Sequence, residues 1–144
     1  MHEASPLGIL GGTFDPVHFG LLRLAEEART ALSLSEVRWI PAGRPAHRAA
    51  PCCTAQHRLE MVRMAIAGNP AFTLDASEVH SAEPSYSVPT LERLRQQVGA
   101  QRPLVLVLGA DAFLGLSSWH RWQDIFALAH LAVATRPGCH IDND

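Results

Sequence analysis

Gly11-Gly12-Thr13-Phe14-Asp15-Pro16-Val17-His18-Phe19-Gly20 is the stretch that decides the fold, because it joins an apolar strand to a helix. Leu7–Leu10, just before it, is short, apolar and typical of a buried parallel strand. Asp15 is typical of a helix N-cap, and Pro16 of the first helical position. The glycines allow a phosphate close to the backbone, and the helix start offers free N–H groups. The stretch therefore predicts a phosphate site, with His18 donating to a phosphate oxygen.

The remaining apolar segments alternate between strand and helix patterns. Further strands are predicted at 37–40, 72–74, 104–108 and 131–134, and helices from Pro16 onward and at 54–67, 90–98, 112–116 and 119–129. This alternation predicts one α/β domain over residues 1–144, an open, mainly parallel, doubly wound Rossmann-like sheet with helices on both faces. Ligands bind such sheets at the carboxyl ends of the strands.

The composition limits the classes of function. Apolar residues make up 47% and charged residues 18% of the 144 residues, which favours a packed core over disorder. The net charge of −2 gives no basic surface for nucleic acid or membrane. The three cysteines fit reduced thiols, and we see neither a signal peptide nor an apolar run of roughly 20 residues. We expect a cytoplasmic protein that binds small molecules, with neither nucleic acid nor membrane as partner.

Several further motifs follow the opening stretch in order. They are Pro41-Ala42-Gly43-Arg44-Pro45-Ala46-His47-Arg48, Ser85-Tyr86-Ser87-Val88-Pro89-Thr90-Leu91, Gly109-Ala110-Asp111, Trp119-His120-Arg121-Trp122 and Arg136-Pro137-Gly138. Through nearly the whole chain, these motifs resemble the nucleotidyltransferase superfamily with an H-x-G-H signature, whose fold is of the nucleotidyltransferase/adenine nucleotide alpha hydrolase-like type. The closest resemblance is to the bacterial nicotinate-nucleotide adenylyltransferases.

The resemblance implies one reaction in NAD biosynthesis. The 5′-phosphate of nicotinate mononucleotide attacks the α-phosphorus of ATP, giving nicotinate adenine dinucleotide and pyrophosphate without a covalent enzyme intermediate. Such an enzyme positions two polyanions and neutralises the charge that grows on the transferred phosphoryl group. Mg²⁺ is expected on the ATP phosphates, held mainly by phosphate oxygens and water.

The resemblance also implies roles for individual residues. It places His18 on the ATP phosphates as the catalytic residue and assigns nucleotide or phosphate binding to Gly11, Gly12, Thr13, Phe14, His47, Arg48, Gly109, Asp111 and Arg136. It assigns the nicotinate ring and its carboxylate to Ser87, Trp119 and His120.

Alternative interpretations of these residues stay open. His47 and Arg48 also fit a solvated pair in a loop, and Trp119 fits ordinary core packing. Asp111 fits either a ribose hydroxyl or the N-cap of a helix that begins at Ala112. Tyr86 fits a wall of the pocket.

Two departures from the family pattern stand out. Leu21 occupies the place of the second signature histidine, and leucine cannot donate to a phosphate. By analogy with the loss of one oxyanion donor, the chemical step would slow by roughly 10²–10³. The chain also ends at Asp144, before the family's I-S-x-T-x-x-R-like motif, so we expect the C-terminal part of the domain to be missing and the exposed sheet to favour a homo-oligomer.

Two rival functions follow from these observations. A phosphopantetheine adenylyltransferase-like enzyme shares the opening stretch, but that family does not explain the motifs around Ser87 and Trp119. A catalytically impaired nucleotide-binding module would explain Leu21 and the short C-terminus.

Overall fold

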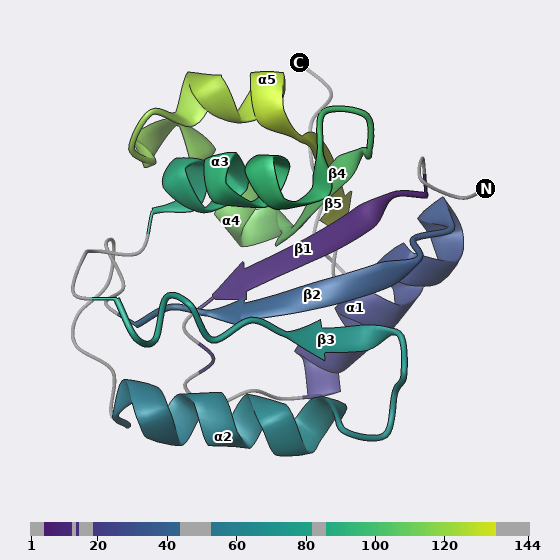
Figure 1. The fold of residues 1–144 in the computed structure, drawn as a ribbon, viewed down its shortest axis with the longest axis vertical. Helices are drawn as coiled ribbons and strands as arrows, with labels where there is room; N and C mark the ends of the chain where they lie inside the picture. The colour runs from purple at the N-terminus through teal and green to yellow at the C-terminus, as the bar shows by residue number, and fades with distance from the viewer. Residues whose placement is uncertain (1–4, 13, 15–18, 44–52, 82–85, 135–144) are drawn as a thin grey trace.

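The sheet is built from five strands, all paired in parallel, in the order β3-β2-β1-β4-β5 (Figure 1). The computed structural model describes residues 5–12, 14, 19–43, 53–81 and 86–134. The strands are β1 (Leu7–Gly12), β2 (Glu36–Pro41), β3 (Phe72–Leu74), β4 (Leu104–Gly109) and β5 (His130–Ala134). The predicted open parallel sheet is confirmed. The chain moves from β1 outward to β3 and then returns to place β4 on the other side of β1.

Helices cover both faces of the sheet (Figure 1), as alternation in the sequence predicts. The helices are α1 (Phe19–Leu32), α2 (Ala55–Ile66), α3 (Ser87–Val98), α4 (Ala110–Leu114) and α5 (Ile125–Leu128), with short 3-10 turns at Leu116–Ser118 and Trp122–Asp124. Successive strand residues point to opposite faces, so β1 and β4 contribute to both cores. No helix in these described ranges is long and apolar enough to cross a membrane.

Two apolar clusters form the cores. On one face Ile9, Leu104 and Leu106 pack with Leu91 and Leu94 of α3. On the other face the strands pack with helices α1 and α2, through Leu10, Val37, Trp39, Val105, Val107, Ala25, Val62 and Ile66. The sequences of the buried parallel strands are therefore nearly continuous apolar runs, because helices cover both faces of the sheet.

The predicted start of the helix near Thr90 is wrong by one turn. Helix α3 begins at Ser87, so Pro89 lies inside the first turn. Proline is tolerated there because the first N–H groups of a helix have no intrahelical partner. The correction matters because it places Ser87, a predicted nicotinate residue, at the beginning of a helix.

The predicted helix over 119–129 is also wrong. Arg121 has a left-handed backbone with φ of 54°, which ends any helical run through this position. The segment instead forms a turn, the 3-10 helix Trp122–Asp124, and the short α5. Helix α4 likewise begins at Ala110 and ends at Leu114, before Gly115, two residues earlier than the predicted 112–116.

Candidate functional site

The carboxyl ends of β1 and β4 lie side by side where the chain order of the sheet reverses (Figure 1). Strand β1 ends at Gly12 and β4 at Gly109, so two glycines follow adjacent buried strands. A reversal point of this kind leaves a crevice outside the strand ends, the usual ligand site of open α/β sheets. The structure thus brings together two of the predicted nucleotide motifs.

Gly12 and Phe14 are shaped by the core beneath them. The Phe14 side chain is only 5% exposed, and its ring centroid lies 5.5 Å from that of Trp39. A Cβ at Gly12 would lie 3.3 Å from the Phe14 ring, which leaves little room for a side chain. Phe14 also has φ of 53°, a strained conformation for a bulky residue. Packing of the buried ring against Trp39 can hold that conformation.

Five predicted site residues lie outside the described residues. They are Thr13, His18, His47, Arg48 and Arg136, and their roles stay predictions. Leu21 is described, in the first turn of α1, where it is half-buried and packs against the cluster that contains Trp39. Its place in the apolar stripe of the helix is confirmed.

At the end of β4, Gly109 and Asp111 face open space. Gly109 is the N-cap of α4, and a Cβ there would meet no atom within 4 Å. Asp111 is the second residue of α4 and is exposed, so its predicted role as the N-cap is wrong. Its carboxylate remains at a strand end, where it suits a ribose hydroxyl.

The two nicotinate motifs meet through a pair of rings. Tyr86 precedes the first residue of α3, Ser87, and its ring centroid lies 4.5 Å from that of His120. The start of α3 and the turn at 119–121 are therefore neighbours, although more than thirty residues separate them in sequence. Trp119 is half-buried and packs against the core, as does Trp122, so the core-packing interpretation holds for both indoles.

Arg121 orients that turn through two ion pairs, and the motif that contains it did not predict these partners. Its guanidinium lies 3.0 Å from a carboxylate oxygen of Glu92 on α3 and 2.9 Å from one of Asp124. Hydrogen bonding to Glu92, and then to Asp124, raises the pKa of Arg121 further above its ordinary value. Exposed pairs of this kind contribute little stability, but they orient the left-handed turn against α3.

Arg58 was not predicted as a site residue, and Gly43 was noted only as part of the motif that begins at Pro41. Arg58 on α2 is only 1% exposed and donates to backbone carbonyls beside the carboxyl end of β2. Gly43, next to that end, lies against the backbone of Glu78. A buried arginine within the 3.6-residue pattern of a helix cannot be distinguished from a surface arginine by sequence alone.

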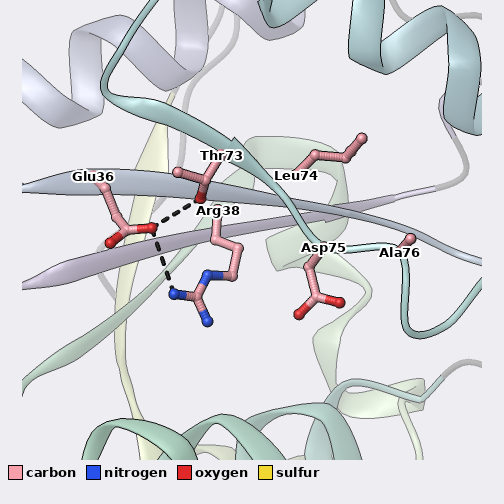
Figure 2. A pocket seen from close by; sticks show the side chains of 6 residues that line it. All are labelled: Glu36, Arg38, Thr73, Leu74, Asp75 and Ala76. Carbon is pink, nitrogen blue, oxygen red and sulfur yellow. Dashed lines mark hydrogen bonds and ion pairs between the residues drawn. The ribbon is translucent and has the colours of Figure 1, made fainter.

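A polar depression of about 340 Å³ lies over the β2–β3 edge of the sheet (Figure 2). Glu36 accepts hydrogen bonds there from Thr73 at 2.8 Å and from Arg38 at 3.5 Å. Asp75, also in its lining, pairs with Arg93 at 3.1 Å. The charges thus neutralise one another, and none of the predicted site residues that the structure describes lines this depression.

The potential metal ligands are scattered. Across the described ranges, no group of three or more His, Cys, Asp or Glu residues could hold a metal ion.

A comparison with known protein families covers nearly the whole chain. A family model described as cytidylyltransferase-like matches residues 9–143. The chain belongs to the cytidylyltransferase-like family. Similar relatives carry the name of the group that the ordered motifs resemble, so that resemblance is confirmed.

Two proteins with similar sequences carry the name of this group. A protein of Dechloromonas aromatica (strain RCB) named probable nicotinate-nucleotide adenylyltransferase is 63% identical over 139 residues, which cover 96% of this chain and 64% of that protein. A protein of Aeromonas hydrophila with the same name is 51% identical, again over 95% of this chain and 64% of that protein. The chain thus spans about 64% of the length of these relatives.

Solved structures confirm the fold. Nicotinic acid mononucleotide adenylyltransferase of Plasmodium falciparum, in complex with NaAD, is 15% identical with a TM-score of 0.79, over 96% of this chain and 68% of that one. The same enzyme in complex with APC gives a TM-score of 0.76 over 96% of this chain and 67% of that one, also at 15% identity. At this identity the likeness concerns the backbone arrangement only.

Proposed function

We propose that this chain transfers the adenylyl group of ATP to nicotinate mononucleotide, giving nicotinate adenine dinucleotide and pyrophosphate, in NAD biosynthesis. The observation that carries the proposal is the pair of neighbouring strand ends, Gly12 on β1 and Gly109 on β4, at the reversal point of a sheet whose relatives are named for this activity. Two nucleotides can meet at such a crevice.

The chemistry is an in-line displacement at phosphorus. An oxygen of the mononucleotide 5′-phosphate forms a bond to the α-phosphorus of ATP, while the bond from that phosphorus to the bridging oxygen of pyrophosphate breaks. The protein contributes orientation and donors for the equatorial oxygens, and it need not form a covalent intermediate. We assign the backbone around Gly12, and His18, to the ATP phosphates, and Asp111 to a ribose hydroxyl.

The acceptor would bind on the other side of the crevice. Ser87 begins α3, so backbone N–H groups in its first turn lack intrahelical partners and can donate hydrogen bonds to the nicotinate carboxylate. His120, held against Tyr86, borders the same place. Since the Trp119 indole is engaged in the core, we assign the ring contact to its exposed edge and to the Tyr86–His120 pair. His47, Arg48 and Arg136 remain the predicted phosphate contacts.

Mg²⁺ would bind together with ATP. We assign the cation to the ATP phosphates, where phosphate oxygens and water would be its main ligands. When bound, the cation would neutralise charge on the phosphates. The chain's own residues orient the nucleotide around it.

The direct test is pyrophosphate release with ATP and each of three acceptors: nicotinate mononucleotide, nicotinamide mononucleotide and phosphopantetheine. We expect turnover that is fastest with nicotinate mononucleotide. Turnover of phosphopantetheine with none of nicotinate mononucleotide would assign the chain to the sister activity.

One observation favours a second candidate, a nucleotide-binding module with weak turnover. Leu21 is half-buried and packs against the core, at the position where the family signature has a histidine donor. Calorimetric titration with ATP and with nicotinate mononucleotide separates the two. Binding of both without pyrophosphate release supports the module, and release at a rate typical of enzymes, about 1 per second or more, excludes it.

A further inference from the structure

Arg58 is a fully buried cation at the start of α2. Its side chain is 1% exposed, and all three of its nitrogen positions donate to backbone carbonyls. Nη1 donates to Ala42 at 2.6 Å, Nη2 to Gly43 at 3.3 Å and Nε to Cys53 at 3.3 Å. Burying a guanidinium is costly unless its N–H groups are hydrogen-bonded, so these three bonds are what allows the fold to bury Arg58.

The carbonyls that Arg58 binds are the two ends of one segment. Ala42 and Gly43 follow the last residue of β2, whereas Cys53 lies ten residues later, just before the N-cap of α2. A planar guanidinium presents its donors in a fixed fork, and it therefore sets the separation of these ends. The N–H of Ala42 donates in turn to the Gly12 carbonyl at 2.8 Å, which ties the same point to the end of β1.

Gly43, whose carbonyl Arg58 binds, also contacts the loop that follows β3. A Cβ at Gly43 would lie 2.1 Å from the Glu78 carbonyl oxygen, so the two backbones touch. The Glu78 carboxylate accepts a hydrogen bond from the Thr90 hydroxyl in the first turn of α3. That hydroxyl also lies 3.2 Å from the Tyr86 carbonyl oxygen, beside Ser87.

We propose that Arg58 is a positioning residue for the acceptor nucleotide. It holds the end of β2 against the loop at Glu78, and through Thr90 it sets the place of the α3 start that we assign to the nicotinate carboxylate. This inference rests on the proposed function. The Ala42–Gly12 bond joins backbone to backbone and does not need the guanidinium, whereas the links through Glu78 and Thr90 lead to the acceptor side. The loss of Arg58 should therefore weaken the binding of nicotinate mononucleotide more than that of ATP.

The chain offers a matched control. Arg95 donates to the carbonyls of Gly99 at 3.1 Å, Arg102 at 2.5 Å and Leu128 at 2.7 Å. These carbonyls lie at the C-terminal end of α3 and just before β4 and β5, at the sheet edge opposite the strand ends of the site. Arg95 therefore makes the same kind of carbonyl clamp in a place remote from the proposed acceptor.

The test compares Arg58→Lys, Arg58→Gln and Arg95→Lys with the unaltered protein. Lysine keeps the charge but not the planar fork, and glutamine keeps an amide donor without a buried charge. We measure KM and kcat for each substrate by pyrophosphate release, Kd for nicotinate mononucleotide and ATP by calorimetry, and thermal unfolding.

For both Arg58 variants we expect KM and Kd for nicotinate mononucleotide to rise about tenfold or more, because small misplacements of positioning groups are costly. The ATP constants should stay within about twofold, which marks a loss specific to the acceptor. Arg95→Lys should lower the unfolding temperature and leave both substrate constants unchanged.

Several results would overturn the inference. Arg58 would have only a general stabilising role if its variants changed the constants for both substrates equally or changed neither. The same conclusion would follow if Arg95→Lys caused the same changes, or if both Arg58 variants failed to fold while Arg95→Lys folded. If the unaltered protein neither binds nor uses nicotinate mononucleotide, the proposed function itself fails and the acceptor role fails with it. If it binds and the Arg58 variants bind equally well, only the inference fails.

Discussion

Gly43→Ala is the substitution whose cost the structure sets most directly. An added Cβ would lie 2.1 Å from the carbonyl oxygen of Glu78, 2.9 Å from its carbonyl carbon and 3.1 Å from the Cα of Val79. Close carbon–oxygen contacts in proteins are roughly 3.3 Å or longer, so the two backbone segments must separate by about 1.2 Å. Backbone atoms cannot rotate aside as a side chain can.

The expected magnitude follows from that displacement. Forcing one extra methyl group into a packed contact costs about 1–3 kcal/mol, and here both obstructing groups are backbone, so we expect about 3 kcal/mol. For a chain of this size each kcal/mol lowers Tm by about 2–4 °C, which gives a decrease of roughly 6–12 °C. Thermal and urea unfolding, followed by circular dichroism, measure both quantities.

Gly68→Ala is the matched control. A Cβ at Gly68 would meet no atom within 4 Å, and its φ lies outside the left-handed region. We expect no loss and up to about 1 kcal/mol of added stability, since alanine reduces the entropy of the unfolded chain. Equal unfolding temperatures for Gly43→Ala and the unaltered protein would refute the packing described between 43 and 78.

Three further predictions concern the signature position, acid sensitivity and one helix end. If the site lacks a donor to the ATP phosphates, Leu21→His should raise kcat by a factor of roughly 10²–10³. An unchanged rate of pyrophosphate release would show that the missing donor does not limit the reaction. Burial works to raise the pKa of Asp75, but hydrogen bonds from Ser77 and the nearby Arg93 outweigh it and lower that pKa. The stability from this depressed pKa is therefore complete above the ordinary aspartate value of about 3.9 and is lost as pH falls through the lower folded value. Urea unfolding between neutral and acidic pH should show less acid sensitivity in Asp75→Asn than in the unaltered protein, and identical profiles would contradict the assignment. Ser33, exposed after α1, has φ of 54°, so Ser33→Gly should stabilise the fold by roughly 0.5–1 kcal/mol in the same assay, whereas destabilisation would argue against the left-handed backbone.

The strands were predictable because their information is local. Leu104–Leu108 is apolar without interruption and β-branched at alternate positions, and the structure extends this strand by one residue to Gly109. Thr54 was predicted as the start of a helix, and its hydroxyl accepts the N–H of His57 at 3.1 Å. Where the prediction failed, at 119–129, the obstacle was a single left-handed arginine, which no pattern of apolar residues announces.

The candidate site was only partly predictable. Gly12, Gly109 and Asp111 follow apolar strands and could be placed at one edge of the sheet from topology rules. The meeting of Tyr86 with His120 could not, because it depends on how α3 packs beside the turn that Arg121 orients. Trp119 offered two interpretations from sequence; the structure shows its packing against the core, and its contact with the nicotinate ring stays a prediction.

The sequence by itself determined the order of the strands and of the longer helices, the glycines at the strand ends and the family, because backbone preference and apolar period act over a few residues. Tertiary structure alone decided that Arg58 is buried, that Gly43 meets Glu78, and that two distant motifs adjoin. The physical reason is that a hydrogen bond or a contact between segments depends on the relative placement of whole elements. Burial of their apolar faces fixes that placement, and no local stretch of sequence contains it.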